Sequence, residues 1–402
     1  MSKRILFVSP HMIVGGVEKA LLAMFSACHE RGYDIDAVFV RNRGGFAADI
    51  PEYVHVAEIP VTDEEADILL GGGAHRAVKR YLRTRHPIKA LRVVLRKLFR
   101  PKAIAEYLND FDKIPSIDTH YDISVCYHMH MPFILRFVAE KTTADIKVAW
   151  IHNDFMTSGF RVGHYKKALN QYDKFFAVSE QLKEEFIALL PEFSKKTEVF
   201  HNLVDENAIL KQSEEFYPPE YDKQETKILS VGRLTEQKGF DIAIKTAKLL
   251  KQNNIKFIWF IVGDGEQHDI LENLITKNAL RDEVHLLGVK KNPYPYMRFC
   301  DIYVQPSRHE GYCLTLSEAK ILAKPIIATD FAGAREQLEN NVTGIICSAT
   351  TEELFQAMRD LISNTKKRES LSVSLRDAQN AKNDFDKLEN FWREARENRI
   401  CQ

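Results

Sequence analysis

Two glutamates flank a sharp turn in the second half of the chain. Glu310 precedes Gly311, and Glu318 lies in a dense apolar stretch that predicts a helix buried against a sheet. An apolar run over 301–305 predicts the strand that leads into the turn. The N–H groups of a helix start bind anions such as phosphate, whereas carboxylates repel phosphate and accept hydrogen bonds from sugar hydroxyls. The pattern therefore indicates a nucleotide sugar with its diphosphate on the helix start.

A pair of basic residues follows another predicted strand. The strand expected over 227–232 ends at Arg233, and Lys238 lies further along the same loop, where it enters a helix. Both side chains could point at one diphosphate, where positive charge is needed as a phosphoryl leaving group departs. The alternative is that they form surface ion pairs with Glu236 or Asp241.

Both stretches resemble the retaining glycosyltransferases of family four, also called glycosyl transferases group 1. The string Pro-Ser-Arg-x-Glu-Gly-Tyr-x-Leu-x-Leu-x-Glu-Ala over 306–319 is similar to the family's glutamate motif, and Gly-Arg-Leu-x-x-x-Lys-Gly over 232–239 to its second motif. The resemblance implies the α/β GT-B fold, in which two Rossmann-like domains face each other across the active site. The implied parts are an acceptor-side domain at 1–205, a nucleotide-sugar-binding domain at 206–383, and a helix at 384–402 that crosses back to the first domain.

The resemblance also implies a role for each motif residue. Arg233 and Lys238 would neutralise the donor diphosphate as the glycosidic bond breaks. Glu310 would orient hydroxyls of the donor sugar, and Glu318 would bind the ribose. The amides of the helix start would cradle phosphate, and the backbone after the strand at 284–288 would contact the base. The further donor-binding residues expected in this half are Gly263, Val289, Tyr312, Cys313, Leu314 and Thr315.

The first half offers candidates at the ends of predicted strands. A strand over 4–9 leads into Gly15 and Gly16, and glycines there let a phosphate approach the backbone. In the resembled family this Gly-Gly-x-Glu turn faces the donor diphosphate. His152 follows the strand at 147–151, where the family has a histidine that touches the donor sugar. A packing turn and an ordinary loop histidine are the alternatives.

Neither acidic nor histidine pairs in this half predict a metal site. Asp34 and Asp36 spell an Asp-x-Asp pair, which holds a metal in another glycosyltransferase class. In that class the pair follows an apolar strand, whereas Asp34 and Asp36 precede one. We therefore interpret them as a polar entrance to the strand. His128 and His130 have no carboxylate or cysteine partner nearby in the sequence. We therefore expect no metal and no cofactor besides the nucleotide-sugar substrate.

Residues 71–105 differ from the rest of the chain in charge. Basic side chains recur over 76–102, and no acidic residue lies between His75 and Ala105. A basic amphipathic helix is typical of membrane-surface binding, because anionic headgroups attract each basic side chain by about 1 kcal/mol. The segment predicts contact with an anionic membrane surface, and a solvated helix that covers the sheet is the alternative. It carries few aromatic residues for stacking on nucleic acid.

Composition bounds the class of protein. The 402 residues include 56 basic and 56 acidic side chains, so net charge gives no reason to expect nucleic-acid binding. Strands that alternate with helices predict mostly parallel sheets in two or three domains. The six cysteines form no Cys-x-x-Cys pair, which favours reduced thiols. Neither a signal peptide nor a transmembrane helix is expected. The predicted location is cytoplasmic, peripheral at the inner face of the cell membrane.

These features predict a metal-independent glycosyltransferase of the hexosyltransferase type that acts in polysaccharide biosynthesis. It would move a sugar, with retention, from a UDP-linked donor to a hydroxyl of a lipid-linked or cell-surface glycan. UDP is chosen because it is common among related enzymes. No protein nucleophile is evident, and the resemblance implies same-face attack in which the leaving diphosphate helps take the acceptor proton. The alternatives are a nucleotide-sugar epimerase on the same fold, a non-catalytic partner of a glycosyltransferase, and a basic membrane or nucleic-acid adaptor.

Overall fold

Most of the chain is described by the computed structural model: residues 3–62, 114–153, 162–222, 224–378 and 384–400, with a few single residues between these ranges. The basic side chains of the segment at 71–105 lie outside the described residues, so its contact with a membrane surface stays a prediction. The chain divides into two compact units. Unit 1 comprises Met1–Leu203 with Asp384–Gln402, and unit 2 comprises Val204–Asn383.

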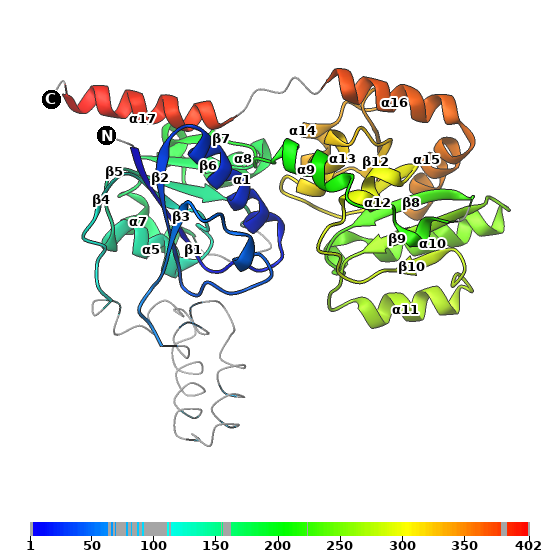
Figure 1. The fold of residues 1–402 in the computed structure, drawn as a ribbon, viewed down its shortest axis with the longest axis horizontal. Coiled ribbons are helices and arrows are strands. Elements are labelled where there is room, and N and C mark those ends of the chain that lie inside the picture. The colour runs from blue at the N-terminus through cyan, green and yellow to red at the C-terminus, as the bar shows by residue number, and fades with distance from the viewer. Residues whose placement is uncertain are drawn as a thin grey trace. The chain divides into compact units, whose positions relative to one another are not determined.

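Unit 1 is built on a parallel sheet with the strand order β3-β2-β1-β4-β5-β6-β7 in its described part (Figure 1). Strand β1 pairs with β2 on one side and β4 on the other, so that Ile5 lies level with Ile35 and Ile123. The strands are β1 Lys3–Ser9, β2 Tyr33–Phe39, β3 Val54–Glu58, β4 His120–Cys126, β5 Thr143–Ile151, β6 Lys174–Ala177 and β7 Thr197–Val199. The helices are α1 Gly16–Glu30, α5 Pro132–Lys141, α7 Lys166–Leu169, α8 Glu180–Leu189 and α17 Phe385–Ile400, with short 3-10 turns at Ala47–Asp49, Val162–Tyr165 and Pro191–Lys196.

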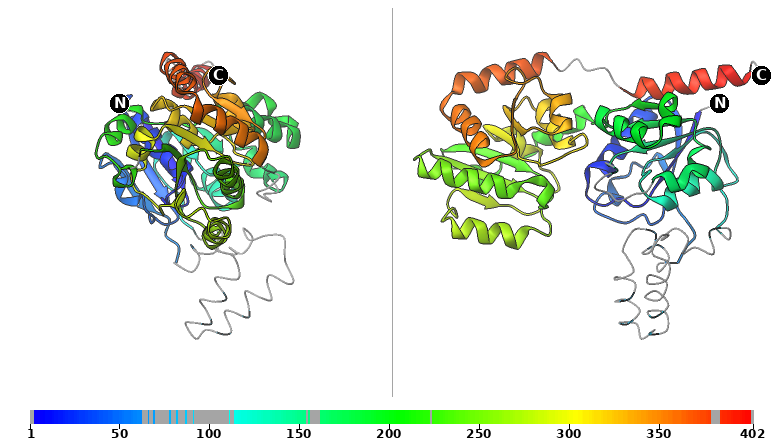
Figure 2. Two further views of the ribbon diagram at one scale, coloured as in Figure 1. Left: turned by 90° about the vertical axis from the view of Figure 1, so that its right-hand side faces the viewer. Right: turned by 180° about the vertical axis from the view of Figure 1, so that it is seen from behind.

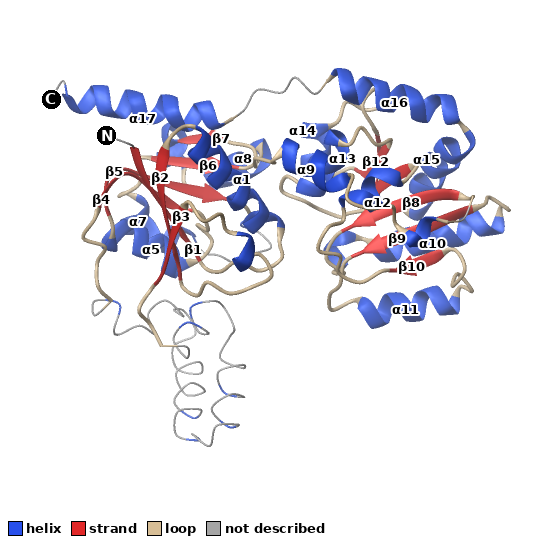
Figure 3. Cartoon of the chain, in the orientation of Figure 1, coloured by secondary structure: helices blue, strands red, loops and turns tan. Residues whose placement is uncertain are grey.

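Unit 2 has its own parallel sheet, in the order β10-β9-β8-β11-β12-β13, with helices on both faces (Figure 3). The strands are β8 Thr226–Val231, β9 Phe257–Val262, β10 Val284–Leu286, β11 Ile302–Gln305, β12 Ile326–Thr329 and β13 Ile345–Cys347. The helices are α9 Glu206–Ser213, α10 Phe240–Gln252, α11 His268–Lys277, α12 Tyr294–Phe299, α13 Leu314–Ile321, α14 Ala332–Gln337, α15 Thr351–Ser363 and α16 Thr365–Asp377, with 3-10 turns at Pro219–Tyr221 and Glu236–Lys238.

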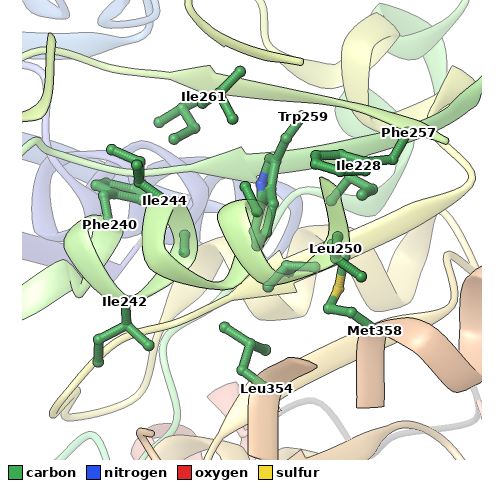
Figure 4. Close-up of a cluster of buried hydrophobic side chains, with 14 of the residues drawn as sticks. Ile228, Phe240, Ile242, Ile244, Leu250, Phe257, Trp259, Ile261, Leu354 and Met358 are labelled. Carbon is green, nitrogen blue, oxygen red and sulfur yellow. The ribbon is translucent and has the colours of Figure 1, made fainter. Parts of the chain in front are cut away.

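Burial on both faces explains the apolar strands of unit 2. Every residue of β9 is buried, as expected for a parallel strand that is covered by helices on both sides. On one face, Trp259 packs with α10 and α15, whose Leu250 and Met358 belong to the same cluster (Figure 4). On the other face, Phe260 belongs to a second cluster that includes Leu316 of α13. These two clusters hold the strand ends, and the loops that follow them, in place.

The C-terminal helix α17 packs on unit 1. The backbone N–H of His201 donates to Asp384 Oδ2 at 2.7 Å, just before the chain passes into unit 2. Lys387 Nζ donates to the carbonyl of Val199 at 2.9 Å, and the ring of Phe385 meets that of Tyr33 edge-on at 6.1 Å. Figure 2 shows α17 in red beside the N-terminus, within this unit.

The strands that the sequence predicts are observed close to their expected bounds, and the α/β fold class is confirmed. Both sheets are parallel, so the carboxyl ends of their strands collect the loops that carry candidate residues. Across the described ranges, none of the helices is long and apolar enough to cross a membrane.

Candidate active site

The loop after β11 presents an open helix start. Helix α13 begins at Leu314, and its N-cap, Cys313, has left-handed backbone (φ +67°) and a side chain that does not cap the backbone N–H groups of the helix. The first N–H groups of such a helix are available to an anion. Burial, and then the nearby Glu310 carboxylate, raise the pKa of the Cys313 thiol to about 12. Cys313 therefore shapes this site as a neutral, buried side chain.

Lys238 and Glu310 form an ion pair beside this helix start. Lys238 Nζ contacts Glu310 Oε1, and the two side chains are only 17% and 10% exposed. Burial alone would lower the pKa of Lys238, but the Glu310 carboxylate outweighs burial and holds it above its ordinary value. Arg233 is exposed, and it lies close enough for its positive charge to lower the pKa of Lys238 slightly against the effect of Glu310. The structure thus brings together three of the four predicted catalytic residues.

Asp241, one of the two carboxylates weighed as surface partners of these cations, has other contacts. Asp241 accepts two hydrogen bonds from the Arg308 guanidinium, at 2.8 and 3.0 Å, and one from Lys245 at 3.0 Å. The backbone carbonyl of Glu236 also accepts from Arg308, at 2.7 Å. Arg308, a motif residue without a predicted role, therefore ties the loop after β11 to the loop after β8.

Glycines allow the loops at this edge of the sheet to touch. Gly263 follows β9 with φ +144°, and a Cβ there would lie 1.9 Å from the carbonyl oxygen of Gly232. Its own N–H donates to the carbonyl of Gly288, after β10, at 2.9 Å. Gly239 has φ +67°, and a Cβ there would lie 2.0 Å from the carbonyl oxygen of Pro306. Only glycine fits these positions, and Gly263 acts here through its backbone.

Glu318 lies one turn into α13 and is buried. The hydroxyl of Tyr294, at the start of α12, donates to Glu318 Oε1 at 3.4 Å. Burial, and then the Glu318 charge, raise the pKa of Tyr294 above its ordinary range. Sequence reasoning missed Tyr294, because a tyrosine in a different helix carries no local signal of this contact.

The other predicted donor-binding residues lie around the same edge of unit 2. Thr315, in the first turn of α13, donates to Gln305 Oε1 at 3.0 Å, and the carbonyl of Tyr312 accepts from Gln337 Nε2. Leu314 is buried. Val289 is exposed on the loop after β10, next to the glycine that bonds to Gly263.

In unit 1 the glycine turn begins a helix and holds a buried acid. Gly15 is the N-cap of α1, with extended backbone, and Gly16 is its exposed first residue. Glu18, in the first turn, is buried and lies 3.3 Å from Nδ1 of His11. A carboxylate is stabilised in this position by the helix dipole. The Gly-Gly-x-Glu spacing was a signal for Glu18, which the predicted site left out.

His152 lies in a group of buried rings at the ends of β4 and β5. Its ring centroid is 4.7 Å from that of Tyr127 and 5.9 Å from that of His128. Burial, reinforced by His130, lowers the pKa of His152 to about 3, and burial likewise lowers the pKa of His128 to about 3. Both rings are therefore neutral at physiological pH and can donate and accept hydrogen bonds.

The Asp-x-Asp pair serves as a partner of other side chains. Asp36 accepts from the hydroxyl of Tyr121 at 2.5 Å and from Arg4 Nη2 at 3.1 Å, and Asp34 lies 3.4 Å from Arg4 Nε. These contacts fit the interpretation of the pair as a polar entrance to β2. The described cysteines are free thiols, and most of them are buried.

The motifs of unit 2 are matched by a known family. Residues 211–376 match the family model described as glycosyl transferases group 1. The similarity to the glycosyl transferases group 1 family therefore covers these residues. The recognition from the two motifs is thereby confirmed, because both lie within the matched residues.

Two curated relatives of this chain are named as glycosyltransferases. An uncharacterized glycosyltransferase of Methanocaldococcus jannaschii, MJ1059, is 30% identical over 256 residues, which cover 60% of this chain and 62% of the relative. N-acetylgalactosamine-N,N'-diacetylbacillosaminyl-diphospho-undecaprenol 4-alpha-N-acetylgalactosaminyltransferase of Campylobacter jejuni is 31% identical over 179 residues, which cover 44% of this chain and 47% of the relative. The chain thus spans less than two thirds of the length of either relative.

A solved structure extends the likeness to the whole chain. HepE of Anabaena, solved in complex with UDP-glucose, matches 99% of this chain and 100% of its own, with a TM-score of 0.69 and 18% identity. At this identity the likeness shows the fold, and the fold is GT-B. The residues that match the group 1 model lie within unit 2.

Proposed function

We propose that this protein is a retaining glycosyltransferase that transfers a sugar from a nucleoside diphosphate donor to an acceptor hydroxyl without a metal. The observation that carries the proposal is the ion pair of Lys238 and Glu310 beside the open start of α13. A lysine held charged at a helix N-terminus provides both electrostatic and hydrogen-bonding partners for a diphosphate. With Arg233 nearby, protein cations supply the positive charge that the leaving group needs.

Each residue has a role in this proposal. Lys238 and Arg233 stabilise the charge that develops on the diphosphate, and the amides from Cys313 to Thr315 bind its oxygens. Glu310 accepts hydrogen bonds from hydroxyls of the donor sugar, and Glu318 from the ribose. The roles of His152, Gly15 and Gly16 toward the same donor rest on the family resemblance.

The donor and the acceptor follow from the relatives. We choose UDP because HepE was solved with UDP-glucose. A hydroxyl of a lipid-linked or cell-surface glycan is the acceptor, since the name of the Campylobacter relative specifies a glycan on diphospho-undecaprenol. Location at the inner face of the membrane, through the basic segment at 76–102, belongs to the same proposal. Nucleic acid is not a proposed partner.

The test is a thermal-shift screen of the full chain with UDP, GDP, ADP and their common sugars, without and then with magnesium. A ligand that binds only the folded protein at a hundredfold excess over its Kd stabilises it by about 2.7 kcal/mol. We expect a rise in Tm with one nucleotide family, indifferent to magnesium and reduced in Lys238→Ala and Arg233→Ala. Lys248→Ala removes an exposed charge from α10 and serves as the matched control.

Three outcomes would overturn parts of the proposal. No shift with any nucleotide would remove the donor site and favour a non-catalytic partner or adaptor. A shift that requires magnesium would refute metal independence. Conversion of the nucleotide sugar into its epimer without an acceptor, seen by proton NMR, would identify an epimerase.

A further inference from the structure

A chain of buried polar side chains runs from the middle of β11 to the carboxylate of Glu310. The hydroxyl of Tyr303 donates to Gln305 Oε1 at 2.7 Å, and Gln305 Nε2 donates to Ser307 Oγ at 2.8 Å. Ser307 Oγ donates in turn to Glu310 Oε1 at 2.8 Å. Tyr303, Gln305 and Ser307 are all 0% exposed. Water does not compete for these hydrogen bonds, so the geometry of each link depends on its neighbours.

The amide of Gln305 gives this chain a direction. Its oxygen accepts from two hydroxyls, those of Tyr303 and of Thr315 at 3.0 Å, and this turns its nitrogen toward Ser307. Ser307 has one hydroxyl proton. Because its oxygen accepts from the amide, that proton is donated to Glu310. A reversed amide would draw the proton away and leave two oxygens of Ser307 and Glu310 facing each other at 2.8 Å.

The chain also fixes which oxygen of Glu310 faces a ligand. Lys238 and Ser307 both bond to Oε1, and within the described part of the chain these are the hydrogen bonds of this carboxylate. Oε2 is then the oxygen that accepts from a sugar hydroxyl. Thr315 belongs to the first turn of α13. The side-chain amide of Gln305 is therefore linked to Glu310 through Ser307 and to the start of α13 through Thr315.

We propose that Gln305 is a positioning residue of the donor-sugar site, which orients the Glu310 carboxylate through Ser307 and ties the start of α13 through Thr315. The inference rests on the proposed function, because the proposed function assigns Glu310 to the donor sugar. The amide never touches the ligand. It holds the acceptor oxygen in the one orientation in which a sugar hydroxyl can donate to it.

A purely structural role for Gln305 is distinguishable, because another buried residue supports the same backbone. Thr329 Oγ1 donates to the carbonyl of Gln305 at 3.2 Å and to that of Ser307, and it is also 0% exposed. Both of these acceptors are backbone carbonyls, not side chains of the hydrogen-bonded series through Gln305. Thr329→Val keeps the volume and removes this support, so it is the matched control for loss of stability at the end of β11.

The experiment compares the affinities of UDP and of a UDP-sugar for the full chain by calorimetry. The probes are UDP and the tightest binder among UDP-glucose, UDP-galactose, UDP-N-acetylglucosamine and UDP-N-acetylgalactosamine. Ser307→Ala and Gln305→Glu should weaken binding of the UDP-sugar by about fivefold or more, the size expected for one hydrogen bond to a charged group. Binding of UDP should stay within about twofold, because UDP has no sugar to bond to Glu310 and both variants keep a side-chain oxygen at position 305 that accepts from Thr315. Thr329→Val should leave the ratio of the two affinities unchanged.

The Gln305→Glu variant adds a pH signature. An ionised carboxylate at this position accepts the Ser307 proton and takes it from Glu310, whereas a protonated carboxyl donates to Ser307 as the amide does. Burial raises the pKa of a carboxyl, so both forms occur near neutrality. The loss of UDP-sugar affinity should therefore be large at about pH 8 and partly restored at about pH 6. The wild type and Ser307→Ala should show no such recovery.

The outcomes separate the inference from the function on which it rests. Gln305→Glu and Ser307→Ala variants that keep the wild-type ratio of affinities, or that lose both affinities equally, would overturn the positioning role. A wild-type chain that binds neither UDP nor any of the four sugars would refute the proposed donor site, and the positioning role with it. Selective loss of the sugar, with recovery of Gln305→Glu at lower pH, supports it.

Discussion

The buried histidines of unit 1 should make its stability fall below neutral pH. Burial lowers the pKa of His128 and of His152 from 6.5 to about 3, so the folded state keeps both rings neutral. The unfolded chain binds a proton at each ring below pH 6.5, and the folded chain does not until the pH approaches 3. Their contribution is therefore intact above pH 6.5 and is lost as the pH falls.

The size of the effect follows from the displacement of the two pKa values. Each pKa unit corresponds to about 1.4 kcal/mol, and about 1.5 units separate pH 5 from the ordinary pKa of histidine. Each ring should therefore cost unit 1 about 2 kcal/mol of unfolding free energy at pH 5, and the pair about 4 kcal/mol. That is a large part of the stability of a typical domain.

Urea unfolding at pH 7.5 and pH 5 measures this loss. Trp150 and Trp392 report on unit 1, and a Trp259→Phe background removes the signal of unit 2. His152→Gln should lose about 2 kcal/mol less than the parent between the two pH values. His120→Gln replaces a histidine of unit 1 that is 59% exposed, and it should behave like the parent. An equal loss in the parent and His152→Gln would refute the neutral, buried state of the ring.

Three further predictions concern glycine, the C-terminal helix and the ion pair. Gly239→Ala should destabilise unit 2 by well over the roughly 1–2 kcal/mol of left-handed strain, because its Cβ would strike a carbonyl. Gly288→Ala (φ +68°) meets open space and should cost only that strain, so equal losses of Tm would contradict the argument. Asp384→Asn should lower the stability of unit 1 by about 2 kcal/mol at pH 7 in urea unfolding. The His201 hydrogen bonds outweigh burial and hold the pKa of this carboxyl at about 2 instead of 3.8, so the difference from wild type should fade as the pH drops from 3.8 toward 2. Lys238→Met should cost about 3 kcal/mol by leaving Glu310 buried without its cation. Adding Glu310→Gln should recover part of that loss, whereas additive losses in the double-mutant cycle would show that the pair is uncoupled.

The residues whose type and spacing form a recognisable motif could be predicted from the sequence. Arg233, Lys238 and Glu310 each follow an apolar run, and parallel strands bring the ends of such runs to one edge of a sheet. The contact between Lys238 and Glu310 joins residues far apart in the sequence, yet it follows from this rule and from opposite charge. The C-terminal helix was also predictable, from the apolar side chains over 384–398.

Other features of the site depend on tertiary contacts that no local sequence pattern indicates. Gln305 is the last residue of an apolar strand, and nothing in the sequence distinguishes a polar strand end that is solvated from one that is buried. Cys313 has left-handed backbone, which residue type does not suggest for cysteine. Tyr294 reaches Glu318 from another helix. These features are tertiary, because the partner that satisfies each group comes from a distant part of the chain.

Two buried polar groups in unit 2 show how structure separates support from function. Ser230 accepts from the Trp259 indole at 3.0 Å and donates to the carbonyl of Val304 at 2.6 Å, so its chain of hydrogen bonds ends in backbone. The chain through Gln305 ends on the carboxylate of Glu310, a group that can also bind a ligand. A series of hydrogen bonds that ends in backbone adds stability, whereas one that ends on Glu310, the carboxylate proposed to bind the donor sugar, also sets the direction in which that group accepts. We therefore expect Ser230→Ala to lower Tm without changing the ratio of UDP-sugar to UDP affinity, and Ser307→Ala to change that ratio.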